Sequence, residues 1–218
     1  MDISEAIRTR HSVRHYTDRP IEPEKADALN AVIKEINAET GLHFQLVLNE
    51  PEAFTGAMAH YGNFTGVANY FVLAGTKKKD LEVGYYGEKL VLEAQRLGLN
   101  TCWVAMTFSK RKASYTLNRG EKLYVVISVG YGSTQGKQHP SKPLSAISDV
   151  TDASPEWYKK AIEAVSLAPT AVNQQKFTFF LDGDRITAKA GSGFYTVMDL
   201  GIAEYHFDAV TGKKNFGI

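Results

Sequence analysis

The stretch "EVGYYGEKLVLEAQRLGLNTCWVAM", from Glu82 to Met106, decides how this sequence is interpreted. Wound as a helix, its first part is apolar on nearly every side, which is typical of a helix buried at the centre of a protein. The part that follows, "NTCWVAM", is a short apolar run with the character of a buried strand. A central helix that leads into a buried strand is therefore the expected middle of the fold.

Helices alternate with apolar strands on both sides of this stretch. A helix is expected at 2–10, where Asp2 is a candidate N-cap, and another at 21–37. The second carries one apolar stripe, because four apolar residues recur at helical spacing: Leu29, Val32, Ile33 and Ile36. Strands are expected at 43–49, 66–76 and 122–132. This alternation indicates a layered α/β or mixed α+β domain.

A second, shorter series of elements begins near Ser154. It predicts a helix at 154–168 with Ser154 as cap, strands at 176–181 and 185–190, and a final helix at 193–210. When the final helix is laid on the central one, Gly201 matches Gly87 and Gly212 matches Gly98. This coincidence, together with the repeated element order, suggests an internal repeat. Since no linker separates the two series, one compact unit is expected.

Composition narrows the class of protein. The 218-residue chain has a formal net charge of +1, so nothing global favours nucleic acid or an anionic membrane as a partner. It has one cysteine and no apolar run long enough to span a membrane. The six histidines are scattered without metal-ligand spacing, so no metal is assigned. A soluble cytoplasmic protein is the expectation.

The strongest chemical signal is the basic run "RTRHSVRHY" at 8–16. If the chain is extended after the first helix, alternate residues share a face, and Arg10, Ser12 and Arg14 project together. Two guanidinium groups with a hydroxyl between them suit a phosphate or another anion. The alternative interpretation is a solvated basic turn, and the residues alone leave the two about equally favoured.

Two other patterns are interpreted as structural. Cys102 lies in an apolar strand, where a packed thiol is expected rather than a nucleophile. The run "VGYGSTQG" at 129–136 imitates a dinucleotide-binding fingerprint. The following "KQHPSKP" cannot open a helix, so the context that such a fingerprint needs is missing.

Four segments together resemble the nitroreductase family, which are FMN-dependent oxidoreductases with a mixed sheet. "RTRHSVRHY" resembles the family's N-terminal flavin-binding motif, and 87–106 resembles its central helix, glycine–leucine turn and flavin-contacting segment. "VVISVGYG" with "HPSKPLSAI" is similar to its last core strand and the basic stretch behind it. "APTAVNQQKF", 168–177, is similar to its Ala-Pro-Ser/Thr-Ala-x-Asn-x-Gln-Pro motif. The resemblance implies an α+β fold with mixed central sheets flanked by helices and an internal pseudo-twofold repeat.

The order of these motifs is unusual for the family. Ordinary members are homodimers that carry the proline–asparagine motif soon after the basic one, and each FMN sits at the subunit interface. Here the proline–asparagine motif comes only after Ala168. The resemblance therefore implies a fused pseudo-dimer like the family's thermophilic-type, single-chain branch. Residues 1–150 would supply the phosphate side, and 151–218 would supply the partner's side. A monomer is expected, with further self-association left open.

The resemblance also implies a set of cofactor-binding residues: Arg10, His11, Ser12, Arg14, Ala105, Met106, Lys142, Pro169, Thr170 and Asn173. The basic motif and Lys142 would hold the FMN phosphate, and Arg14 would face the pyrimidine edge. Backbone amides of Ala105 and Met106 would meet N5 and O4, and the late motif would close the site. Asn63 is a further candidate ligand. Lys176 departs from the family pattern, because it replaces a proline.

The implied activity is ping-pong hydride transfer. NADH or NADPH would reduce the flavin, and a small aromatic acceptor, a nitroaromatic or a quinone, would then reoxidise it. No side-chain nucleophile or metal is needed, because the flavin carries the chemistry. Two alternatives stay open at this point. One is an FMN-binding module without turnover, and the other is an unrelated α/β protein whose basic motif binds a different phosphate or nucleotide.

Overall fold

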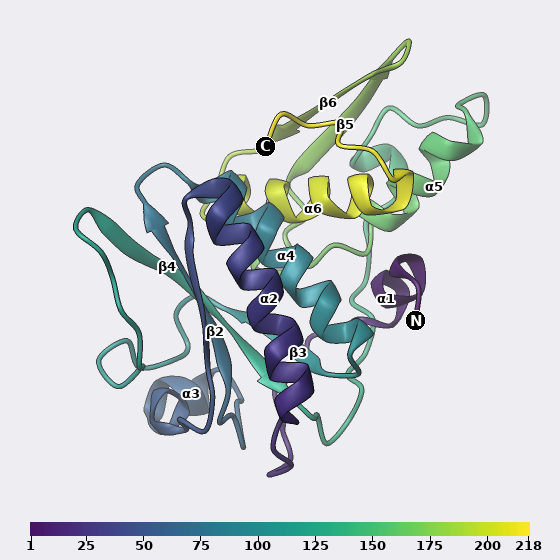
Figure 1. Ribbon diagram of the computed structural model, residues 1–218. Coiled ribbons are helices and arrows are strands. Elements are labelled where there is room, and N and C mark those ends of the chain that lie inside the picture. The colour runs from purple at the N-terminus through teal and green to yellow at the C-terminus, as the bar shows by residue number, and fades with distance from the viewer. The chain divides into compact units, whose positions relative to one another are not determined.

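The computed structural model covers residues 1–218 and contains six α-helices and six strands (Figure 1). The α-helices are α1 Ile3–Thr9, α2 Pro23–Thr40, α3 Ala57–Tyr61, α4 Asp80–Arg96, α5 Glu156–Val165 and α6 Thr196–Thr211. The strands are β1 His43–Val47, β2 Tyr70–Thr76, β3 Asn100–Val104, β4 Glu121–Gly130, β5 Phe177–Asp182 and β6 Arg185–Ala190. Short 3-10 turns occupy Glu52–Phe54, Leu144–Ala146 and Ala171–Asn173. The expected α+β composition is confirmed, and every predicted helix and strand forms.

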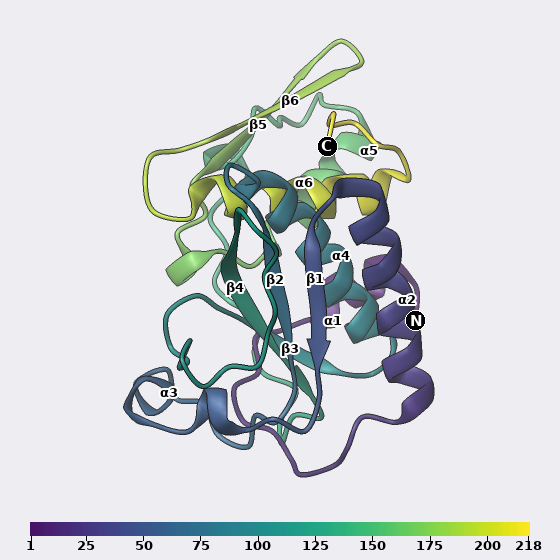
Figure 2. The same cartoon turned by 60° about the vertical axis from the view of Figure 1, so that its left-hand side comes forward.

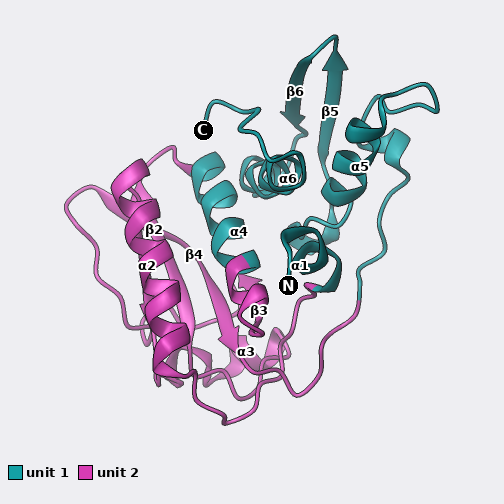
Figure 3. Cartoon of the chain, turned by 45° about the vertical axis from the view of Figure 1, so that its right-hand side comes forward, with its two compact units in different colours: residues 1–9, 80–92, 138–218 teal, residues 10–79, 93–137 magenta.

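The chain divides into two compact units that are interleaved along the sequence (Figure 3). Unit 1 contains residues 1–9, 80–92 and 138–218, and unit 2 contains residues 10–79 and 93–137. The sequence predicts a different division, in which residues 1–150 supply the phosphate side of a flavin site and 151–218 supply the other side. That assignment of roles stays a prediction. No helix is both long and apolar enough to cross a membrane.

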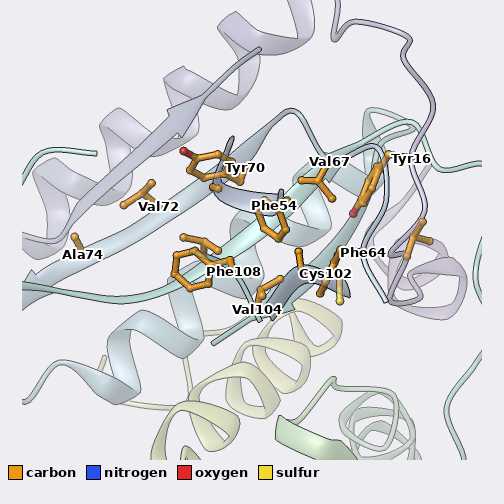
Figure 4. Packing of buried hydrophobic residues seen from close by; sticks show 14 residues of the cluster. Tyr16, Phe54, Phe64, Val67, Tyr70, Val72, Ala74, Cys102, Val104 and Phe108 are labelled. Carbon is orange, nitrogen blue, oxygen red and sulfur yellow. The ribbon is translucent and has the colours of Figure 1, made fainter. Parts of the chain in front are cut away.

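Unit 2 is built on a four-stranded sheet in the order β1-β2-β4-β3, with every neighbouring pair antiparallel. Helix α2 lies against the sheet (Figure 2). Of its predicted stripe, Leu29, Ile33 and Ile36 are buried, whereas Val32 is half-buried. A second apolar cluster around Phe54, Tyr70 and other side chains includes the thiol of Cys102 (Figure 4). Cys102 is thus the packed thiol that the sequence predicts. Parallel pairing occurs as isolated bridges outside the named strands.

Unit 1 contains a close crossing of two helices. A Cβ atom on Gly84 of α4 would lie 2.0 Å from the backbone oxygen of Met198 in α6. Reciprocally, a Cβ atom on Gly201 of α6 would lie 2.1 Å from the backbone oxygen of Leu81. Real side chains are never that close, so glycine is required at both positions for the backbones to approach. The two glycines therefore set the packing distance of the helix pair.

A buried polar pair also joins these helices. His206 and Glu88 are completely buried, and Nε2 of His206 lies 3.0 Å from Oε1 of Glu88. Nδ1 of the same ring faces the backbone oxygen of Ala164 at 2.8 Å, so Nδ1–H donates there. The ring of His206 thus joins the carboxyl group of Glu88 to the backbone of α5. Such a pair is costly to break, since either partner alone would be left buried and unsatisfied.

One predicted helix cap is confirmed and one is wrong. The backbone N–H of Glu5 donates to the Asp2 carboxylate at 2.8 Å, as expected for the start of α1. Ser154 does not cap α5, because its hydroxyl accepts from the backbone N–H of Thr151 at 3.0 Å. The residue that immediately precedes the helix is Pro155, whose backbone is extended there. The serine therefore closes the preceding turn instead.

Candidate functional site

The basic motif is extended, as the sequence predicts. It follows α1 and runs beside the end of β3, where the backbone N–H of Val13 donates to the carbonyl of Thr101 at 3.0 Å. Ser12 pairs with Thr101 in a parallel bridge, and Tyr16 pairs with Gly132 in an antiparallel one. Val13 and Tyr16 point into the unit 2 core. Between them Arg14 is exposed, and Ser12, before Val13, is half-buried.

The buried thiol of Cys102, in the unit 2 core, lies beside the basic motif. Burial raises the pKa of the Cys102 thiol, and this outweighs the lowering by the positive charge of Arg14, by a hydrogen bond to Ser12 and by the charge of Arg10. All three predicted anion ligands of the basic motif therefore act on one atom of β3. Arg10 is 3% exposed, whereas Arg14 is exposed. That the two guanidinium groups and the hydroxyl converge on one anion stays a prediction.

The loop after β4 lies against the same segment. Gly136 has a φ of +71°, and a Cβ atom there would lie 2.9 Å from Cβ of His11 and 3.1 Å from the backbone oxygen of Ser12. Asn100 holds this loop in place, because its Oδ1 accepts from the N–H of Gly132 and its Nδ2 donates to Gln135. No helix opens after the glycine-rich run, so its interpretation as something other than a dinucleotide fingerprint is supported.

A pocket of about 310 Å³ opens in unit 2 beside this segment. Its lining mixes polar and flat side chains with small ones: Arg14, Tyr61, Gly62, Asn63, Phe64, Trp103, Val104, Ala105 and Thr107. Arg14, Ala105 and the additional candidate Asn63, all singled out in the sequence, are thus brought together. The lining therefore provides one positive charge, on Arg14, and aromatic surface against which a flat ring could pack.

Asn63 takes part in a polar chain at the rim of this pocket. Its Nδ2 donates to Nε2 of His15 at 3.2 Å, so that ring nitrogen is an acceptor. The other nitrogen, Nδ1, then carries the proton and donates to the Thr65 hydroxyl at 2.8 Å. His15 was not singled out as a site residue. These two hydrogen bonds orient the Asn63 amide, which lines the pocket together with Arg14.

The backbone after β3 offers unused donors. The strand ends at Val104, and the next residues, Ala105 and Met106, form a bend. Their backbone N–H groups donate to no acceptor in the structure, and Met106 is 66% exposed. Unused backbone donors are uncommon in folded proteins unless water or a ligand accepts from them. These amides are where the sequence predicts contacts to a flavin.

In unit 1, the proline–asparagine motif is bound to the basic stretch that precedes α5. Nδ2 of Asn173 donates to the backbone oxygen of Pro140 at 2.9 Å, and Gln175 donates to the same oxygen at 3.0 Å. The ammonium group of Lys142 donates to the carbonyls of Gln174 and Gln175. Gln175 is 3% exposed and was not predicted as a site residue. Its amide links Pro140, Asn173 and Lys142.

The motif has an uncommon backbone. Val172, Asn173 and Gln175 have φ values of +46°, +55° and +44°. Asparagine tolerates this left-handed region, but a β-branched residue there is a genuine outlier. Val172 is also 80% exposed, so burial of its side chain does not explain the conformation. Strain of this kind concentrates at functional sites, which supports the assignment of the motif to one.

Asp199 anchors the motif on α6. Its Oδ1 accepts from the backbone N–H of Ala171 at 2.9 Å, and its Oδ2 accepts from the Gln174 amide at 2.7 Å. Burial raises the pKa of Asp199 to about 6, and the two hydrogen bonds lower it less. Pro169 is buried and Thr170 is half-buried. The Thr170 hydroxyl accepts from the N–H of Gln175 at 3.1 Å. Asp199 was not predicted, because it lies far along the chain from the motif.

The predicted ligands fall into two sets. Arg10, His11, Ser12, Arg14, Ala105 and Met106 belong to unit 2, whereas Lys142, Pro169, Thr170 and Asn173 belong to unit 1. Within each unit the structure brings the members of the set into one region. That both sets bind a single flavin stays a prediction.

Known proteins resemble this chain in sequence and in fold. A sequence model of the family described as "Putative TM nitroreductase" matches residues 2–211. No protein with curated function matches the sequence. Among solved structures, a Thermotoga maritima protein described as a nitroreductase has 22% identity and a TM-score of 0.72. That match covers 96% of this chain and 83% of the other.

Two further solved structures match about two thirds of the chain. A Desulfovibrio desulfuricans protein described as a "putative nitroreductase in complex with FMN" has 19% identity and a TM-score of 0.51, covering 66% of this chain and 93% of its own. A Bacteroides thetaiotaomicron protein described as an NADH dehydrogenase/NAD(P)H nitroreductase has 20% identity and the same TM-score, covering 66% and 95%. These likenesses show the nitroreductase-like fold. Because the family match spans nearly the whole sequence, this chain belongs to the TM nitroreductase family.

Proposed function

We propose that this protein is an FMN-dependent oxidoreductase that passes hydride from NADH or NADPH to a small aromatic acceptor, a nitroaromatic or a quinone. The observation that carries the proposal is the unit 2 pocket, where Arg14 and aromatic side chains meet beside the unused N–H groups of Ala105 and Met106. The FMN complex of the Desulfovibrio relative and the name of the Bacteroides relative support the cofactor and the co-substrate.

The residues present fit FMN. A flavin ring has a flat apolar body and a polar edge of oxygens and nitrogens, and the pocket offers a flat lining together with cationic and N–H donors. The phosphate needs charged partners, since a buried dianion without them is very costly. Arg10 and Ser12, beside Cys102, would supply them, with His11 next to them and Lys142 as a further cation. Bound FMN would supply hydride transfer.

Each residue then has a definite task. The guanidinium of Arg14 would face the pyrimidine edge, where negative charge grows when a flavin is reduced, and would stabilise that charge. The N–H groups of Ala105 and Met106 would orient the ring. Pro169, Thr170 and Asn173 would close the site from the strained segment that Asp199 anchors. One chain would thus complete one site, which is the single-chain pseudo-dimer.

Anaerobic titration of the purified protein with NADH tests the proposal. We expect loss of the oxidised flavin absorbance near stoichiometric NADH and its recovery when a quinone is added. In Arg14→Gln the rate of reduction should fall by about tenfold or more, the cost of one preorganised charge. Arg111→Gln, at an exposed arginine of the same unit, is the control and should behave as wild type. If neither NADH nor NADPH, titrated in the same way, reduces the flavin, the protein is instead a binding module without turnover.

A further inference from the structure

A second pocket lies in unit 1, on the outer face of the β5–β6 hairpin. The register pairs Thr178 with Lys189 and Phe180 with Thr187, so these side chains share one face. Lys176 joins them, because it is two residues before Thr178. The opposite face carries Phe177 and Phe179, which are 3% and 0% exposed and pack into the unit. The outer face is therefore the polar side of a half-buried sheet.

The pocket on this face has a volume of about 400 Å³, within the range of small-molecule sites. Three lysines line it: Lys142, Lys176 and Lys189. None of the lining residues is acidic. Phe180 contributes an aromatic ring to the same lining.

The positive charges of this pocket are not neutralised. The ammonium of Lys142 donates to two backbone carbonyls, and that of Lys176 donates to the carbonyl of Ser192 at 3.2 Å. Lys189 lies over the Phe180 ring, with Nζ 5.5 Å from its centroid. Carbonyls and rings orient these groups but carry no net negative charge. A pocket that several ammonium groups line without any acidic side chain attracts an anion.

We propose that this pocket binds a nucleotide, with its phosphate between Lys176 and Lys189 and its base against Phe180. Lysine ammonium groups act as point charges that accept a phosphate in many orientations. The ring of Phe180 gives a flat base an apolar surface. This inference goes beyond the proposed flavin chemistry and does not depend on it.

Calorimetric titration of the protein as purified, with any flavin it retains, tests the proposal. The probes are 5′-AMP, adenosine and inorganic phosphate, each at low and high salt. We expect 5′-AMP to bind more tightly than either of the others and to weaken as salt rises. Lys176→Gln/Lys189→Gln should weaken 5′-AMP by about tenfold or more, since two charged contacts are lost. Phe180→Leu should weaken 5′-AMP and leave inorganic phosphate unchanged.

The control is Lys160→Gln/Lys213→Gln, which removes the same charge from exposed lysines of unit 1 outside the pocket. It should bind 5′-AMP as wild type does. Absence of 5′-AMP binding, or equal weakening by both double variants, would overturn the site. Inorganic phosphate binding as tightly as 5′-AMP would overturn the nucleotide assignment. Circular dichroism and flavin content should be the same in all variants, because the substituted lysines lie outside the proposed flavin set.

Discussion

Glu204 in α6 shows how one buried carboxyl group shapes the stability of this protein. It is 5% exposed, and its Oε2 has no hydrogen-bond partner. Burial, and to a smaller extent the charge of Asp208, raises the pKa of Glu204 to about 8. The folded protein thus keeps a proton on this group that the unfolded chain releases near pH 4.5.

Glu204 makes the free energy of unfolding depend on pH. Between about pH 4.5 and 8 the folded state binds more protons at Glu204 than the unfolded state does, so this group makes stability fall as pH rises. Glu204→Gln should flatten that fall, and the variant should gain most over wild type near pH 8. Urea unfolding at pH 5 and pH 8 measures it. Glu163→Gln, at an exposed position in α5, should leave the difference unchanged. An equally steep fall in Glu204→Gln would contradict the burial account.

Asp199 serves the site by positioning the strained motif. In Asp199→Asn one carboxylate oxygen becomes an NH₂ group, which cannot accept from both Ala171 and Gln174. We expect the free energy of unfolding to fall by about 1–3 kcal/mol, the cost of a buried donor left unsatisfied. Chemical denaturation measures this loss, with the exposed Asp152→Asn as a control. Unchanged stability in Asp199→Asn would show that the motif holds its shape without this anchor.

Val172 should store strain that another residue would release. A left-handed backbone costs a β-branched residue roughly 1–2 kcal/mol, and asparagine tolerates it. Because Val172 is 80% exposed, its replacement loses little burial. Val172→Asn should therefore raise the unfolding free energy by about 0.5–1 kcal/mol. Destabilisation by Val172→Asn would mean that the valine side chain itself holds the motif.

At the scale of elements, the crossing of α4 and α6 should be the least tolerant part of unit 1. A methyl group at Gly84 would overlap the backbone oxygen of Met198, which cannot move aside as a side chain could. Gly84→Ala should cost more than about 3 kcal/mol, at the upper end of overpacking effects. Gly217→Ala, where a Cβ meets open space, should change stability by less than about 0.5 kcal/mol. Similar melting temperatures for the two variants would refute the close crossing.

The elements were predictable from local signals. The stripe of α2 and the apolar runs of β2 and β4 follow directly from residue spacing. Strand order was not predictable in this way, because β4 inserts between β2 and β3 through contacts distant in sequence. The cap assigned to Ser154 failed for a related reason. Its hydroxyl had a nearer competitor in the turn at Thr151, which residue type alone does not reveal.

For the candidate site, too, groupings within one segment could be predicted, whereas contacts between distant segments could not. Arg10, Ser12 and Arg14 could be grouped because alternate residues of an extended segment share a face. Cys102, on which they act, could not be added, since the bridge that brings it there joins residues 12 and 101. For the same reason, the sequence did not indicate Asp199 and Gln175 as site residues. Their roles depend on hydrogen bonds across 28 and 35 residues of chain.

At the scale of the whole molecule, the proline–asparagine motif comes late in the sequence, after Ala168, and far from the basic motif at 8–16. We propose that this order reflects one site completed by one chain. The basic motif and the proline–asparagine motif each occur once in the sequence. The proposal therefore requires a single cofactor for each polypeptide, whatever further self-association occurs.

The amount and identity of the flavin released from the denatured, purified protein test this account most directly. Flavin absorbance measured against polypeptide concentration, with chromatography to separate FMN from FAD, gives both quantities in one assay after saturation with FMN and removal of the excess. We expect FMN at a ratio of about one per chain, because one basic motif supplies one set of charge-assisted phosphate contacts. Absence of bound flavin would contradict the proposed function, and two FMN per chain would contradict the single site.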